Sequence, residues 1–139
     1  MTNDDRAMYT GTALCRNTEV TLRWSRSQMF TILNSAILSF AYDIPKENTR
    51  FRIFISLVGL LIVALWMVSN WRAEVWVRYW RSRLEAFERN KPDPGSVNVF
   101  DSVVYDQPNG VPTHHHLLML LSGLFGLLWC VFCVSAFTQ

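Results

Sequence analysis

Two groups of residues have side chains that could support chemistry. Cys130 and Cys133 form the sequence CVFC, with the two-residue spacing of redox and metal motifs. They lie in an apolar segment, where the reactive thiolate is disfavoured, so we interpret both as packing residues. His114–His116 are adjacent, and adjacent residues on a helix point in different directions, whereas metal ligands must converge. We therefore predict no metal site and interpret the histidines as an anchor at the membrane interface.

The motifs of common enzyme classes are missing from the sequence. It has no glycine-rich phosphate loop, no GxSxG motif and no pair of carboxylates in an apolar segment. The formal net charge of +2 is too small to indicate binding of nucleic acid. We therefore predict that the protein is not an enzyme, has no cofactor and does not bind specific nucleic acids.

Asn34 is the most informative polar residue, because it lies in the middle of a mostly apolar segment. Polar groups at membrane depth must face protein or water. One interpretation is an interhelical hydrogen bond that stabilises a helix bundle. The other is a polar stripe that lines an aqueous path in an assembly. The candidates for such a stripe are Ser27, Thr31, Asn34, Ser35 and Tyr42.

Half of the 139 residues are hydrophobic and only 17% are charged, and the apolar residues are clustered. Residues 51–71 hold one ionisable residue, Arg52, and residues 117–139 hold none. Runs of 18 or more apolar residues are typical of transmembrane helices. We expect an all-α membrane protein with three transmembrane helices, at residues 27–44, 51–71 and 116–137.

The remaining segments connect these spans. Residues 1–26 are predicted to be a cytoplasmic segment in which a helix begins near Asn17. Residues 45–50 form an outer hairpin, and residues 72–90 extend the second helix far into the cytoplasm. Residues 91–115, which are rich in proline, form a cytoplasmic loop. Basic residues flank the first and second spans on one side, which predicts a multi-pass protein with a cytoplasmic N-terminus.

Alternating steps of three and four residues predict the helix faces that pack together. On the second helix this row is Gly59, Val63, Trp66, Asn70, Ala73, Val77, Trp80, Leu84 and Phe87. On the first helix it is Val20, Trp24, Ser27, Thr31, Asn34, Leu38 and Ala41. On the third it is His116, Met119, Gly123, Gly126, Cys130, Cys133 and Phe137. The first helix, if it begins near residue 17, is too short to cover the far end of the second, so either residues 1–16 or another subunit could cover it.

Apolar stripes without a partner usually mark association sites, and small residues let membrane helices approach closely. We therefore predict self-association. The candidate interface residues are Val77, Trp80, Leu84, Phe87, Gly123, Gly126, Cys130 and Cys133.

The segments RSQMFTILNSAILSF and LVGLLIVALWMVSNWRAEVWVRYWRSRLEAFE resemble the RipA family of small, octameric bacterial inner-membrane proteins. Matching positions are Phe30 and Asn34 on the first span, and Gly59 and Trp66 on the second. The resemblance implies a homo-oligomeric ring of about eight copies in the bacterial inner (plasma) membrane. The third span and its three histidines depart from this pattern.

The chain is also similar to the SLATT proteins, small membrane modules of bacterial conflict systems for which pore formation is proposed. From these resemblances we expect an assembly that forms or gates a pore, with a role as a membrane-disrupting effector in anti-phage defence. Arg78, Arg81, Arg83 and Arg89 would contact anionic lipid or an acidic activator. The alternative is a non-conducting scaffold or regulatory subunit that holds a cytoplasmic protein through Trp76, Trp80, Leu84 and Phe87.

Overall fold

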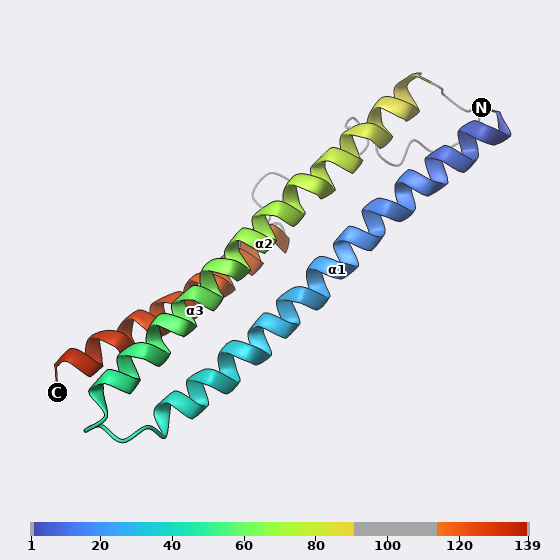
Figure 1. The fold of residues 1–139 in the computed structure, drawn as a ribbon. Coiled ribbons are helices and arrows are strands. Elements are labelled where there is room, and N and C mark those ends of the chain that lie inside the picture. Colours follow the sequence, from blue (N-terminus) through green and yellow to red (C-terminus); the bar gives the residue numbers. More distant parts are fainter. Residues whose placement is uncertain (1, 91–113, 139) are drawn as a thin grey trace. The chain divides into compact units, whose positions relative to one another are not determined.

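The computed structural model describes residues 2–90 and 114–138, which form three helices (Figure 1). Helix α1 spans Asn3–Tyr42, α2 spans Thr49–Asn90 and α3 spans His114–Phe137. This confirms the all-helical fold class and the uninterrupted second helix. The predicted loop of residues 91–115 lies, apart from its last two residues, outside the described residues.

Helix α1 begins much earlier than the predicted start near Asn17. The Thr2 hydroxyl accepts a hydrogen bond from the Asp5 amide, and the Asp5 carboxylate accepts one from the Thr2 amide. This reciprocal pair is a capping box, and Asp4 and Asp5 also suit the positive end of the helix dipole. Asn17 lies inside the helix. The predicted start was wrong because Asn17 resembles a cap, but neither Gly11 nor any other residue before it interrupts the helix.

Two of the helices are long and apolar enough to cross a membrane, α2 and the segment His115–Phe137 of α3. Residues 27–44 do not pass the same test, because polar residues interrupt this part of α1. The composition of the described helices thus supports two of the three predicted spans directly.

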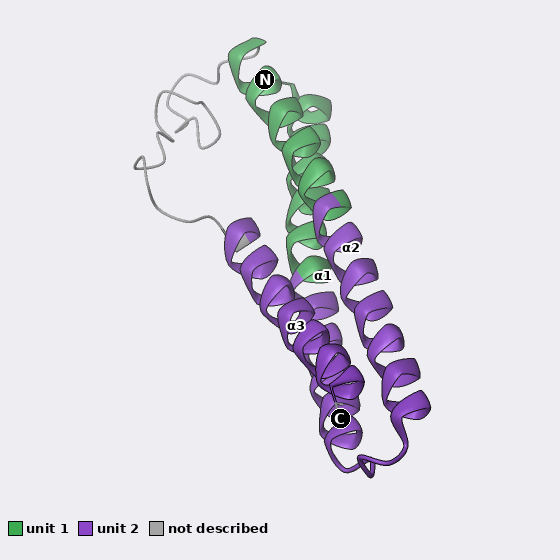
Figure 2. Cartoon of the chain, turned by 90° about the vertical axis from the view of Figure 1, so that its left-hand side faces the viewer, with its two compact units in different colours: residues 1–23, 72–112 green, residues 24–71, 113–139 purple. Residues whose placement is uncertain are grey.

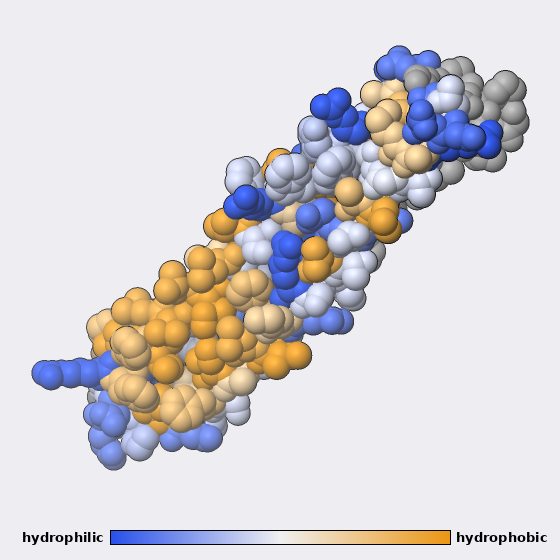
Figure 3. Space-filling view, turned by 45° about the vertical axis from the view of Figure 1, so that its right-hand side comes forward, coloured by the Kyte–Doolittle hydropathy of each residue, from blue (hydrophilic) through white to orange (hydrophobic). Residues whose placement is uncertain are grey.

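The chain divides into two compact units, coloured in Figure 2. Unit 1 contains residues 1–23 and 72–112, and unit 2 contains residues 24–71 and 113–139. Figure 3 shows hydrophobic side chains gathered over unit 2, whereas the visible face of unit 1 is mixed. In unit 1 the first part of α1 packs against the last part of α2.

The core of unit 2 is built around Trp129 of α3, which is fully buried with Ala41, Ile44 and Val63. Its indole ring lies directly over Gly59 of α2. A methyl group at Gly59 would lie 2.1 Å from Cε2 of Trp129, so only glycine leaves room for the ring. Gly126, by contrast, has only an ordinary contact with Val63, at 3.5 Å from the position a methyl group would take.

The second helix packs through the predicted row of residues. Gly59, Val63, Trp66, Asn70, Ala73 and Leu84 are buried, and Val77, Trp80 and Phe87 are half-buried. The predicted face of α1 is correct from Ser27 to Ala41, but Val20 and Trp24 are exposed.

The predicted face of α3 is wrong. His116, Gly123, Cys130 and Phe137 are exposed, whereas Leu118, Ser122, Trp129 and Ala136 are buried. Because α3 is apolar on every side, hydrophobic periodicity gave no contrast between its faces.

The contact between Gly59 and Trp129 makes a specific prediction about stability. Gly59→Ala should destabilise unit 2 by about 1–3 kcal/mol, because the indole ring must move from a packed core. Gly126→Ala is the matched control and should leave stability nearly unchanged. Thermal stability in detergent, followed by the loss of monodisperse protein, measures both; equal midpoints for the two variants would contradict the packing described.

Candidate functional site

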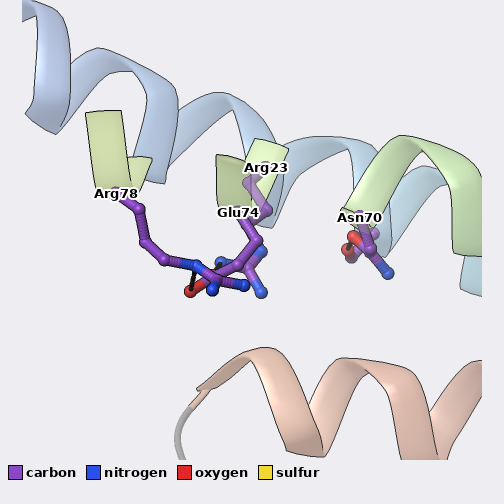
Figure 4. Close-up of polar contacts among 5 residues, drawn as sticks. Arg23, Asn70, Glu74 and Arg78 are labelled. Atoms are coloured by element: carbon purple, nitrogen blue, oxygen red, sulfur yellow. Dashed lines mark hydrogen bonds and ion pairs between the residues drawn. The ribbon is translucent and has the colours of Figure 1, made fainter. Parts of the chain in front are cut away.

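Two interhelical contacts between polar side chains inside unit 2 involve α1, beside a third in which Arg52 of α2 donates to the Ser135 hydroxyl of α3 at 3.4 Å. In the first, the Ser27 hydroxyl of α1 donates to Oδ1 of Asn70 on α2 at 3.1 Å, and Nε1 of Trp66 donates to Ser27 Oγ at 3.3 Å. All three side chains are buried. The contact joins α1 to α2, and Figure 4 shows the side chain of Asn70 on α2.

The second contact joins α1 to α3 through Asn34. Its Oδ1 accepts a hydrogen bond from Nε1 of Trp129 at 3.0 Å, and its Nδ2 donates to the carbonyl oxygen of Phe30 at 2.9 Å. Asn34 and Trp129 are both 0% exposed. Both ends of the amide therefore have partners inside one chain.

These contacts favour the first interpretation of Asn34, an interhelical hydrogen bond. Asn34 and Ser27 act as interhelical hydrogen-bonding residues, and their burial leaves neither of them a face toward a path between subunits. Thr31 is half-buried, and its hydroxyl donates to the Ser27 carbonyl at 2.9 Å. Ser35 and Tyr42 are the two predicted pore-lining residues that remain exposed.

An open polar face on α1 contains Ser35 and Tyr42 together with two residues that the sequence analysis missed, Gln28 and Ser39. All four are exposed, and Tyr42 is 85% exposed. Their spacing of seven, four and three residues keeps them on one side of a helix. Ile32 lies in the same row, four residues after Gln28 and three before Ser35, and is also exposed, whereas the large apolar side chains of Met29 and Phe40 cover the adjacent side. The missed signal was this second row of polar residues, parallel to the buried one.

The hydrogen bond between Asn34 and Trp129 can be measured with a double-mutant cycle. We expect Asn34→Leu and Trp129→Phe each to destabilise the protein. We expect a coupling free energy of about 0.6–1.7 kcal/mol between the two positions, because each variant removes the same bond in an apolar region. Denaturation in mixed detergent gives the four free energies. Additive losses would show that the two side chains do not interact.

In unit 1, a cluster of charges joins α1 to α2. Nη1 of Arg23 lies 2.7 Å from Oε2 of Glu74, and Nε of Arg78 lies 3.3 Å from Oε1 of the same carboxylate (Figure 4). Arg23 is buried, unlike most arginines, so it depends on its partner carboxylate. Arg23 and Glu74 continue the polar rows of Ser27 and Asn70 by four residues, a pattern that could have predicted the pair.

The four arginines predicted to contact lipid or an activator have different environments. Arg78 pairs with Glu74, and Arg81 pairs with Glu85 at 2.8 Å. Arg83 instead lies over the ring of Tyr79, with its guanidinium carbon 5.4 Å from the ring centroid, and Arg89 is exposed. The charged residues Glu74, Arg78, Arg81 and Glu85 follow one side of α2.

Near the start of α1, Tyr9 contacts the end of α2. Its hydroxyl donates to Oε1 of Glu88 at 2.7 Å, and its ring lies 5.8 Å from that of Phe87. Burial raises the pKa of Tyr9 from 10.0 to about 12, and the hydrogen bond and negative charge of Glu88 add to this effect.

A groove of about 480 Å³ lies beside this contact in unit 1. Its lining is mostly aromatic and apolar, and includes Met8, Tyr9, Tyr79, Trp80, Arg83 and Phe87. The rings of Trp76, Tyr79 and Trp80 pack on one another beside it, with centroids 5.1–6.4 Å apart.

The interface residues predicted on α2 are covered within the chain by the first part of α1, which is one of the two alternatives that the sequence left open. Leu84 is 0% exposed, and Val77, Trp80 and Phe87 are half-buried. The early start of α1 explains this coverage. On α3, Gly123 and Cys130 are exposed, and Gly126 and Cys133 are half-buried, so a role of these four in self-association stays a prediction.

Metal ligands do not cluster within residues 2–90 and 114–138, where no three His, Cys, Asp or Glu side chains could hold an ion together. The rings of His115 and His116 lie 5.8 Å apart.

The raised pKa of Tyr9 predicts how stability depends on alkaline pH. The folded state holds the proton more tightly than the unfolded state, so this contribution is present in full below pH 10. It is lost as the pH rises from 10 toward 12. Tyr9→Phe removes it. The difference in thermal stability between wild type and Tyr9→Phe should therefore change over this range, and a constant difference would contradict the assignment.

Comparison with known proteins indicates how copies of this chain assemble. No curated protein and no solved structure matches the chain. One family model matches residues 8–138, which include nearly all of the three helices and both units. On this evidence, the chain belongs to the octameric membrane protein family (8xMP).

Proposed function

We propose that the assembled octamer forms or gates a pore in the bacterial inner membrane. The open polar face of α1, formed by Gln28, Ser35, Ser39 and Tyr42, is the observation that supports this function most directly. Lipid cannot satisfy the hydrogen-bonding groups of these side chains, so they need protein or water at that depth. A face made mostly of hydroxyl and amide groups, with Ile32 between Gln28 and Ser35, is suited to a water-filled path.

This proposal requires a third membrane span at residues 27–44, which comprise the end of α1 and the two residues after it. Two contacts within unit 2 support that depth. Phe30 stacks on Trp66 of α2 with ring centroids 6.0 Å apart, and Asn34 is bonded to Trp129 of α3. Both partners lie in the apolar segments of helices that are able to cross a membrane. Water would then contact the exposed polar residues that, together with Ser27 and Asn34, lower the hydropathy of this part of α1.

The proposed orientation places the N-terminus and unit 1 in the cytoplasm. Arg6, Arg16, Arg23 and Arg26 precede the first span, and six basic residues follow the second span within twenty positions. Short segments with many basic residues stay in the cytoplasm. The resemblance to the SLATT proteins supports the narrower role of a membrane-disrupting effector in anti-phage defence.

Conductance in a planar bilayer tests the pore directly. Ser35→Leu with Ser39→Leu should reduce the single-channel conductance of the octamer to background, because leucine removes the hydrogen-bonding groups that support water. Ala36→Leu is the control, since it adds a similar side chain to a different face of α1 and should still conduct. If the wild-type octamer shows no conductance, the pore is excluded.

A non-conducting scaffold is the second candidate. The exposed guanidinium groups of Arg78 and Arg89 on α2 favour it, because they suit an acidic cytoplasmic partner. A silent wild-type octamer that retains such a partner through these two residues would support the scaffold.

A further inference from the structure

We infer that the aromatic groove of unit 1 is filled by α1 of a neighbouring copy in the octamer. Hydrophobic residues are concentrated on this side of unit 1. Met8 is 57% exposed, and Trp76 and Tyr79 are more than 40% exposed. Such a group of exposed large side chains outside an apolar segment usually marks an association site. The family is octameric, so each copy must contact others.

Charge determines which surface of the neighbour fits. Arg83 lines the groove, and among the described residues no carboxylate forms an ion pair with it. The outward side of α2 carries Arg78 and Arg89, which would repel this guanidinium. The side of α1 that faces away from α2 carries no charge between residues 7 and 21. Its members are Ala7, Thr10, Gly11, Leu14, Asn17, Thr18 and Thr21, all of them exposed.

This outer face of α1 also has the shape that the groove requires. It consists of small side chains around one large apolar residue, Leu14, which is 66% exposed. An added methyl group at Gly11 would meet no atom within 4 Å, so the helix is open to close approach there. A neighbour could therefore insert Leu14 between the aromatic rings while its small residues let the helices approach closely.

The register of unit 1 places the two surfaces at the same height. Tyr9 is bonded to Glu88 and Arg23 to Glu74, so Leu14 lies level with Arg83 in the antiparallel pair. Copies that share one orientation in a membrane are related by an axis along the membrane normal, which keeps equivalent residues at equal height. Leu14 of one copy is therefore level with Arg83 of the next. The contact is directional, because groove and outer face are different surfaces, as a closed ring requires.

The charge at position 14 tests this contact. Leu14→Glu places a carboxylate against Arg83 of the neighbour, and Leu14→Arg places a like charge there. We expect the octamer of Leu14→Arg to dissociate at about tenfold higher protein concentration than that of Leu14→Glu. Mass photometry of diluted, detergent-extracted protein measures the fraction of octamer. Both substitutions are at an exposed position, so each chain should fold.

When Arg83→Glu is added to both Leu14 variants, the octamer with Leu14→Glu should dissociate at the higher protein concentration. The controls are Val75→Glu and Val75→Arg, on the exposed outward side of α2. The order of their dissociation concentrations should stay the same when Arg83→Glu is added. Equal dissociation of the two Leu14 variants in both backgrounds would overturn the inference.

A second measurement does not depend on charge. In a background in which Cys15, Cys130 and Cys133 are replaced by serine, Leu14→Cys with Arg83→Cys should form disulfides between copies and give a ladder of covalent species up to eight chains. Each single variant should give no ladder. Absence of the ladder from an intact octamer would also overturn the inference. Neither measurement involves conductance, so failure here leaves the pore proposal to its own test.

Discussion

A lipid bilayer satisfies no hydrogen bonds, and this constraint accounts for most of the polar residues inside unit 2. Ser27, Asn34 and Asn70 occur in segments that pack among apolar residues, and each has a partner on another helix. The two indole groups of Trp66 and Trp129 donate to this set. The helices are therefore joined by specific polar contacts as well as by dispersion, which fixes their register.

The same constraint separates two kinds of polar residue on α1. Those on the inner row have partners within the chain and hold the helices together. Gln28, Ser35 and Ser39 on the other row are exposed, so in a membrane they must meet water or a neighbouring copy. In an octameric family, the exposed polar residues could contact either water inside the assembly or a neighbouring copy. We assign the polar face of the spanning segment to water, and the uncharged face nearer the N-terminus to subunit contact.

The sequence predicted α2 well, because its row of inward residues alternates clearly with exposed ones from Gly59 to Phe87. It predicted the inner face of α1 only where polar residues interrupt an apolar segment. On α3 the small residues Gly123 and Cys130 suggested a packed face, but the bulky Trp129 is the residue that packs. Its position depends on the space above Gly59, and a single sequence does not reveal which distant glycine a tryptophan covers. The contact of Tyr9 was missed for a simpler reason, since α1 was expected to begin after Tyr9, and the pair of Arg23 with Glu74 was missed because the polar rows of Ser27 and Asn70 were not followed one turn further.

The central claim is that water contacts one face of α1 inside the assembled octamer. Spin labels at Ser39→Cys and Met29→Cys, each in a background without other cysteines, test it in liposomes. A water-soluble nickel complex and molecular oxygen serve as the relaxing agents. We expect the nickel complex to relax the label at position 39 more strongly, and oxygen to relax the label at position 29 more strongly. Oxygen-dominated relaxation at both positions would mean that lipid covers this face, and would contradict the account.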